Sequence, residues 1–131
     1  MKKLALSVAI LGVLVFASAD AVAQKPTRIT FAKGATEKVI SGTMTGFGSK
    51  RVYVIRVKAG QTLMTENAGD NYITIDIKAP KGSTYEPDLA ANCHGQHEVT
   101  PTAAGDYIIT VTECQKADPW RGTFKFKVIV N

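Results

Sequence analysis

Residues 72–78 read Tyr-Ile-Thr-Ile-Asp-Ile-Lys, the clearest alternation of apolar and polar side chains in the sequence. Successive side chains of a β-strand point to opposite faces, so this pattern predicts one apolar and one polar face. We therefore expect a strand here, with Ile73, Ile75 and Ile77 directed into a core.

Similar alternation recurs along most of the chain. Residues 51–57 would direct Tyr53, Ile55 and Val57 to one face. Residues 37–45 contain Gly42, which is expected to mark a bulge or bend. Further inward positions are Tyr107, Ile109, Val111, Phe124, Phe126, Val128 and Val130. Strands are expected at residues 27–31, 37–45, 51–57, 62–67, 72–78, 97–100, 107–112 and 124–130.

No segment shows a sustained helical period of apolar residues. Turn residues separate the expected strands at 58–61, 79–83 and 101–105, and longer loops are expected at 83–96 and 113–122. About eight strands of this kind are typical of an antiparallel β-sandwich or a flattened barrel. The predicted fold is an all-β sandwich with one disulfide.

The N-terminal segment has the features of a Sec-type signal peptide. A lysine pair at residues 2–3 precedes an uncharged apolar run at 4–19, and Ala-Val-Ala at 21–23 is a signal-peptidase pattern. We expect residues 1–23 to be removed and residues 24–131 to form a single domain in the periplasm. The alternative is a retained membrane anchor, but the run is short for a span and no later segment is apolar enough.

Cleavage would change the composition as well as the length. Removing residues 1–23 from the 131-residue chain leaves 108 residues, a length suited to one domain. It also removes two lysines and one aspartate, which lowers the net charge from +5 to +4. The remaining charge is spread along the chain without a dense basic run, so nucleic acid is not an expected partner.

The chain contains two cysteines, Cys93 and Cys114. An exported protein meets oxidising conditions, so a disulfide between them is expected. In the chain-entropy model, a disulfide that closes the loop between these two cysteines contributes roughly 3 kcal/mol of stability. The alternative is a metal site at Cys93, His94 and His97, but a matching downstream pair of ligands is missing. Both histidines are expected to be exposed loop residues, with no metal or other cofactor bound.

No catalytic motif stands out in the sequence. It has no Gly-x-Ser-x-Gly elbow, and the expected disulfide leaves no cysteine as a nucleophile. The carboxylates are isolated and are expected to be solvated surface charges. Those considered as a paired-acid site are Asp70, Asp76, Glu86, Asp88, Glu98 and Asp106. A binding protein is therefore expected rather than an enzyme.

Short motifs recur in the order found in a known family. They are residues 29–34, Ser41-Gly42, Tyr53 with Lys58-Ala59-Gly60-Gln61, and residues 101–107. Together they resemble the bacterial periplasmic inhibitors of g-type and i-type lysozymes, over nearly all of the mature chain. Residues 58–111 are also similar to the pre-peptidase C-terminal β-sandwich modules, which share Ala-Gly-Gln after a strand and Ala-Gly-x-Tyr before the next.

The resemblance implies that a loop blocks the lysozyme cleft. In these inhibitors a loop carrying Ser-Gly-x-Tyr, or a close variant, enters the cleft. The matching residues here are Ala104, Gly105, Asp106 and Tyr107, in which alanine replaces the serine hydroxyl. Residues 114–118 also lack the arginines found on the following loop of the g-type inhibitors.

The expected partner-binding residues therefore come from two loops. Besides residues 104–107 they are Lys116, Trp120 and Arg121. Tyr107 would be the aromatic anchor, and the cations would face the acidic cleft. Both aromatic side chains have an alternative: Tyr107 alternates in phase with the next inward residues and could belong to the core, and Trp120 could cover the open end of the sandwich.

The net positive charge of the mature chain bears on which class of lysozyme is the expected target. A basic chicken-type lysozyme would favour an acidic inhibitor, so a g-type or i-type enzyme fits better. Two further functions stay open: a carbohydrate- or peptidoglycan-binding module, and a small metal-binding protein. Exposed edge strands would also permit a homodimer.

Overall fold

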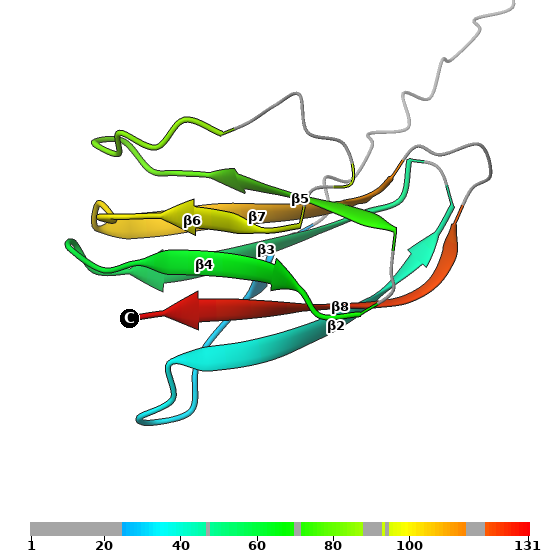
Figure 1. Cartoon of the computed structure of the whole chain (residues 1–131), viewed down its shortest axis with the longest axis horizontal. Coiled ribbons are helices and arrows are strands. Elements are labelled where there is room, and N and C mark those ends of the chain that lie inside the picture. Colours follow the sequence, from blue (N-terminus) through cyan, green and yellow to red (C-terminus); the bar gives the residue numbers. More distant parts are fainter. Residues whose placement is uncertain (1–24, 47, 70–71, 88–92, 94, 115–119) are drawn as a thin grey trace, which may run out of the picture.

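Two four-stranded sheets enclose one apolar core (Figure 1). The computed structural model describes residues 25–46, 48–69, 72–87, 93, 95–114 and 120–131. The strands in this part of the chain are β1 (Thr27–Arg28), β2 (Glu37–Thr45), β3 (Lys50–Val57), β4 (Leu63–Asn67), β5 (Ile73–Lys78), β6 (His97–Val99), β7 (Gly105–Glu113) and β8 (Arg121–Val130).

The sheets have the strand orders β1-β3-β7-β5 and β2-β8-β4-β6. Among the described strands, β1 and β3 are parallel and the other pairs are antiparallel. Strands β7 and β8 are the long central strands of the two sheets. The predicted all-β sandwich is therefore confirmed, as is the disulfide between Cys93 and Cys114. Within the described residues there is no helix with the length and apolar character needed to cross a membrane.

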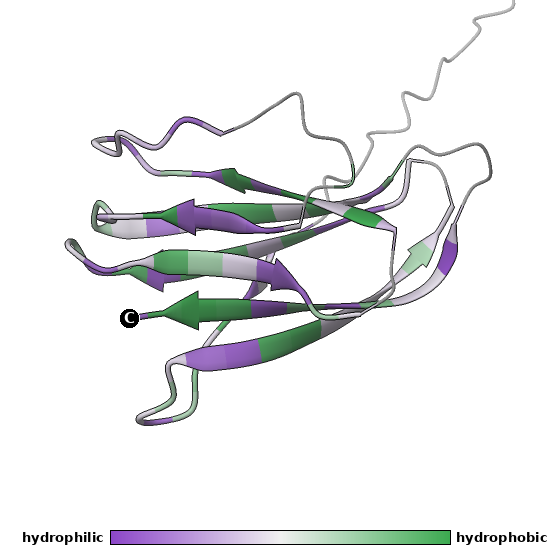
Figure 2. Cartoon of the chain, in the orientation of Figure 1, coloured by the Kyte–Doolittle hydropathy of each residue, from purple (hydrophilic) through white to green (hydrophobic). Residues whose placement is uncertain are grey.

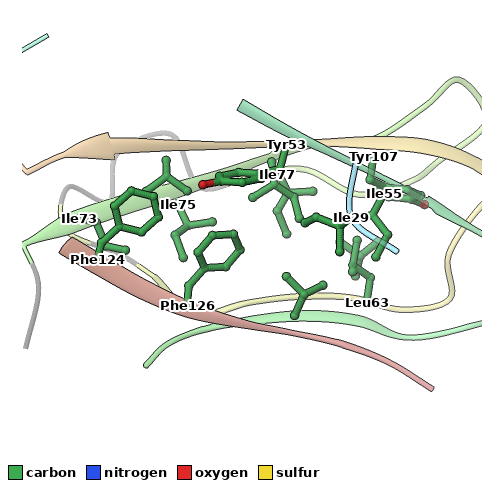
Figure 3. Close-up of a cluster of buried hydrophobic side chains, with 14 of the residues drawn as sticks. Ile29, Tyr53, Ile55, Leu63, Ile73, Ile75, Ile77, Tyr107, Phe124 and Phe126 are labelled. Carbon is green, nitrogen blue, oxygen red and sulfur yellow. The ribbon is translucent and has the colours of Figure 1, made fainter. Parts of the chain in front are cut away.

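The core lies between the sheets, where alternate side chains of the strands meet (Figure 3). Figure 2 shows apolar residues on the strands of both sheets. Ile73, Ile75 and Ile77 of β5 are at most 2% exposed, as the alternation in residues 72–78 predicts. From the opposite sheet, Phe124 and Phe126 of β8 are completely buried, and their rings pack with centroids 6.2 Å apart. Burial of such side chains is the main source of stability in a sandwich of this size.

The first strand is shorter than the sequence predicts. It was expected at residues 27–31 but ends at Arg28. The N–H of Ile29 donates to the Val54 carbonyl at 2.8 Å, and the Ile29 side chain is 4% exposed in the core. The chain then leaves this sheet and passes to β2 of the other sheet. Crossing between the layers ends the strand.

Gly42 does not form the bulge or bend predicted for it. The pairing of β2 with β8 runs without interruption from Glu37 to Thr45, and Gly42 lies opposite Phe124. A Cβ atom at Gly42 would lie 2.3 Å from Cζ of Phe124 and 2.9 Å from the hydroxyl oxygen of Tyr53. Glycine is required here because two aromatic side chains from different sheets lie against its backbone.

We predict that Gly42→Ala lowers the free energy of unfolding by about 1–3 kcal/mol, because the added methyl group must displace a buried ring. Chemical denaturation with tryptophan fluorescence measures this change. The exposed neighbour Ser41 provides the control, since Ser41→Ala should change stability by no more than about 0.5 kcal/mol. Equal effects of the two substitutions would contradict the packing role.

Candidate functional site

The predicted partner-binding residues lie at opposite ends of β7. Ala104, Gly105 and Asp106 lie at its start, where Gly105 pairs with Val57. The strand ends at Glu113, and Arg121 begins β8 on the same side of the sandwich. At about 3.4 Å per residue, nine-residue β7 separates the two groups by roughly 27 Å. The structure therefore does not combine them into one surface.

Two names are used below for these ends. The Tyr107 end comprises residues 58–62 and 101–106, together with the buried Tyr107. The disulfide end comprises residues 45–46, 48–51, 72, 93, 113–114 and 120–122. Lys116 lies outside the described residues. The described residues on either side of it, Cys114 and Trp120, both belong to the disulfide end.

Tyr107 is a core residue and not an exposed anchor. Its side chain is completely buried, in phase with Ile109 and Val111. Its hydroxyl accepts a hydrogen bond from the Ala103 N–H at 3.0 Å and donates to the Ala103 carbonyl at 3.1 Å. The expectation that Tyr107 contacts a partner is corrected, because its ring cannot reach a partner while the fold is intact.

The rest of the Tyr107 end is joined by hydrogen bonds, two of them half-buried and one exposed. Thr102 is 4% exposed, and its hydroxyl accepts from the Gln61 N–H at 3.0 Å and donates to the Lys58 carbonyl at 2.6 Å. The Gln61 side chain in turn accepts from the Lys58 N–H at 2.8 Å. Thr102 and Gln61 therefore fix the two turns against each other.

The glycines of this end also serve the fold. Gly60 has a φ of +79°, a conformation that disfavours other residues. Gly105 has a φ of +143°, and a Cβ there would meet the Pro80 ring at 3.0 Å. The Lys-Ala-Gly-Gln and Ala-Gly-x-Tyr motifs thus have structural roles in this fold.

The disulfide end is held together by the bond between Cys93 and Cys114, whose Cα atoms are 5.0 Å apart. The Cys93 N–H donates to the Thr74 hydroxyl at 2.7 Å. The Cys114 N–H donates to the Tyr72 carbonyl at 2.8 Å. The segment at Cys93 is therefore joined to the ends of β5 and β7.

Glu113 is a buried carboxylate that the sequence analysis missed. It is 5% exposed, and its Oε1 accepts a hydrogen bond from the Trp120 N–H at 2.5 Å. The Trp120 ring lies over Gly122, where a Cβ would meet it at 3.2 Å, and packs partly buried against the core. Trp120 thus covers this end of the sandwich, which is the second of its two predicted roles. The in-phase position of Glu113 with Val111 was the available signal for its burial.

The described surface of the disulfide end is basic. Lys50 and Arg121 are exposed, and Arg51 is half-buried. The acidic residue of this group, Glu113, is buried and bound to the Trp120 backbone. Burial raises the pKa of nearby Tyr53, an effect that the Arg51 charge partly opposes. Tyr72 adds an aromatic ring that is 48% exposed.

The histidine at position 97 is not the exposed loop residue expected from the sequence. It lies in β6 and is 9% exposed. Its Nε2 donates to the Ile75 carbonyl, and its Nδ1 accepts from the Tyr85 hydroxyl at 3.4 Å. Both ring nitrogens and the Cys93 sulfur are therefore used in the fold, and His94 lies outside the described residues. No group of three metal-ligating side chains occurs in the part of the chain that the structure describes.

Structural comparison places this sandwich beside two kinds of protein. PliG of Aeromonas hydrophila, a periplasmic inhibitor of g-type lysozyme, superposes with a TM-score of 0.64 at 23% identity, covering 81% of this chain and 96% of PliG. PliG of Salmonella Typhimurium gives 0.61 at 17% identity, covering 83% and 100%. The pre-peptidase C-terminal domain of Bacillus anthracis collagenase gives 0.51 at 15% identity, covering 83% and 97%.

These similarities establish the fold that was expected from the motifs. No protein-family model matches the sequence, and no curated protein sequence matches it either. At these identities the function of the matched proteins does not follow from the superposition.

We predict that Thr102→Val lowers the free energy of unfolding by about 2 kcal/mol, because it leaves the Gln61 N–H and the Lys58 carbonyl without their buried partner. Thr123, exposed on β8, provides the matched control, since Thr123→Val should alter stability by no more than about 0.5 kcal/mol. Equilibrium urea denaturation compares them. If the two variants unfold at the same urea concentration, Thr102 does not have this structural role.

Proposed function

We propose that this chain is a periplasmic inhibitor of a g-type or i-type lysozyme and that its disulfide end blocks the active-site cleft. The observation that carries the proposal is the superposition on the PliG inhibitors over 96–100% of their length. The cysteine pair and the N-terminal signal pattern support export to the periplasm. The chain acts by binding, without catalysis of its own.

The charge of the disulfide end and its disulfide bond favour it as the inhibitory surface. A lysozyme cleft carries catalytic carboxylates, so a blocking surface gains from cations and loses from exposed acids. Arg121 and Lys50 supply exposed positive charge there. The disulfide orders the surface before binding, which reduces the entropy lost on association.

The Tyr107 end is a weaker candidate because its motif residues are used in the fold. Tyr107 is buried, and Gly105 packs against Pro80. The Asp106 carboxylate at the same end is already paired with Arg28 at 3.3 Å and with Arg56 at 3.9 Å. The proposed contact set is therefore Arg121 and the undescribed Lys116, with Lys50 and Tyr72 added from the structure and only the exposed part of Trp120 retained.

We predict that Arg121→Glu weakens lysozyme inhibition at least about tenfold, because it places a like charge against the cleft carboxylates. Because the Arg121 side chain is exposed, we expect the fold to be retained, and an unchanged melting temperature checks this. The assay is the lysis of bacterial cells by g-type, i-type and chicken-type lysozymes at increasing concentrations of the mature protein. Inhibition of the g-type or i-type enzyme, and little of the chicken-type enzyme, is expected.

A substitution at the other end provides the control. Ala104→Ser restores the hydroxyl that the inhibitor motif carries, at an exposed position of the Tyr107 end. If the disulfide end binds lysozyme, this change leaves inhibition unaltered. Stronger inhibition by Ala104→Ser together with no effect of Arg121→Glu would assign the cleft to the Tyr107 end. No inhibition of any lysozyme at micromolar protein would contradict the proposed function.

A carbohydrate- or peptidoglycan-binding module is the second candidate. Exposed Tyr72 favours it, because an aromatic ring of this kind can stack on a sugar. The superposition on a pre-peptidase C-terminal domain is consistent with a binding module. Sedimentation with purified peptidoglycan in the absence of lysozyme distinguishes the two candidates. Binding that is lost in Tyr72→Ala would support this second function.

A further inference from the structure

A surface groove of about 460 Å³ lies beside β1, away from the disulfide end. Its apolar lining includes Ile29, Phe31 and Ile55. The first and last of these also belong to the core, so the base of the groove is rigid. The segment that joins β1 to β2 forms one wall, and the end of β3 forms the other.

Positive charge surrounds this apolar base. Arg28, Arg56 and Lys58 all line the groove. The two arginines share one carboxylate, that of Asp106, at 3.3 and 3.9 Å. Their side chains are 52% and 75% exposed, so each guanidinium retains donors that face solvent. The cluster therefore carries an excess of positive charge, and one further carboxylate would balance part of it.

Beside this groove the edge strand β1 ends before its neighbour β3 does. Strand β1 pairs with β3 only through Thr27 and Arg28, which lie opposite Tyr53 and Val54. The chain leaves the sheet after Ile29, whereas β3 continues to Val57. On this side of β3, residues 55–57 pair with no strand among those that the structure describes. A backbone edge of this kind can pair with an extended peptide.

We propose that this groove binds an extended acidic peptide, whose carboxylates meet Arg28 and Arg56 and whose aliphatic side chain packs on Ile29, Phe31 and Ile55. The peptide would pair with β3 beyond the point where β1 ends, in the place that a longer β1 would occupy. A free phosphate would leave the apolar base of the groove and the edge of β3 unused, and a phospholipid would leave the edge of β3 unused. The site is separate from the proposed lysozyme-binding surface.

Fluorescence anisotropy with a labelled Glu-Val-Glu-Val-Glu peptide tests the proposal on the mature protein. We expect saturable binding that weakens with added salt and falls at least about tenfold when glutamine replaces the glutamates. Equal binding of the glutamine peptide would overturn the proposal. Binding of dodecanoate or of anionic phospholipid vesicles, without binding of the peptide, would also overturn it.

Two charge reversals separate this site from the proposed function. Arg56→Glu and Arg121→Glu change the net charge equally, and both residues are exposed. We expect Arg56→Glu to weaken peptide binding at least about tenfold while leaving lysozyme inhibition unchanged, and Arg121→Glu to do the reverse. If both variants weaken peptide binding equally, the attraction is general and the groove is not the site. If the protein inhibits no lysozyme, the peptide-binding measurement still tests the groove, because that measurement uses no lysozyme.

Discussion

The packing of β7 against β8 is the constraint on which the rest of the structure depends. Each is a central strand, paired on both sides within its own sheet. Their inward side chains, Tyr107, Ile109 and Val111 on one and Phe124, Phe126 and Val128 on the other, are completely buried. Because these strands run the length of the sandwich, the loops at their two ends cannot share one surface. Function must therefore be assigned to one end or to the other.

The alternation of side chains was sufficient to predict the strands and most of the core. Residues 72–78 illustrate why: apolar residues at every second position are compatible with one buried face only. The same reasoning failed where the cause lies in another part of the chain. The local sequence around Gly42 predicts a bend. Its actual role depends on the rings of Tyr53 and Phe124, which lie on other strands.

The candidate site is harder to predict because residues that are close in sequence can lie far apart in space. The start of β7 contains residues 105–107, and residues 116–121 follow its end. The two groups are therefore close along the chain. A nine-residue strand nevertheless places its two ends far apart. The role of Tyr107 shows a second limit. A sequence motif can reflect the folding of a turn rather than the binding of a partner. Here the Tyr107 hydroxyl bonds to the Ala103 backbone.

The central claim is that the disulfide end, and not the Tyr107 end, meets the lysozyme. Titration of the isotopically labelled mature protein with unlabelled g-type lysozyme, followed by amide NMR signals, tests this directly. We predict that the signals of Gly48, Lys50 and Arg121 shift or broaden, while those of Gly60, Thr102 and Gly105 stay in place. Perturbation confined to Gly60, Thr102 and Gly105 would contradict the claim and move the inhibitory surface to the opposite end of the sandwich.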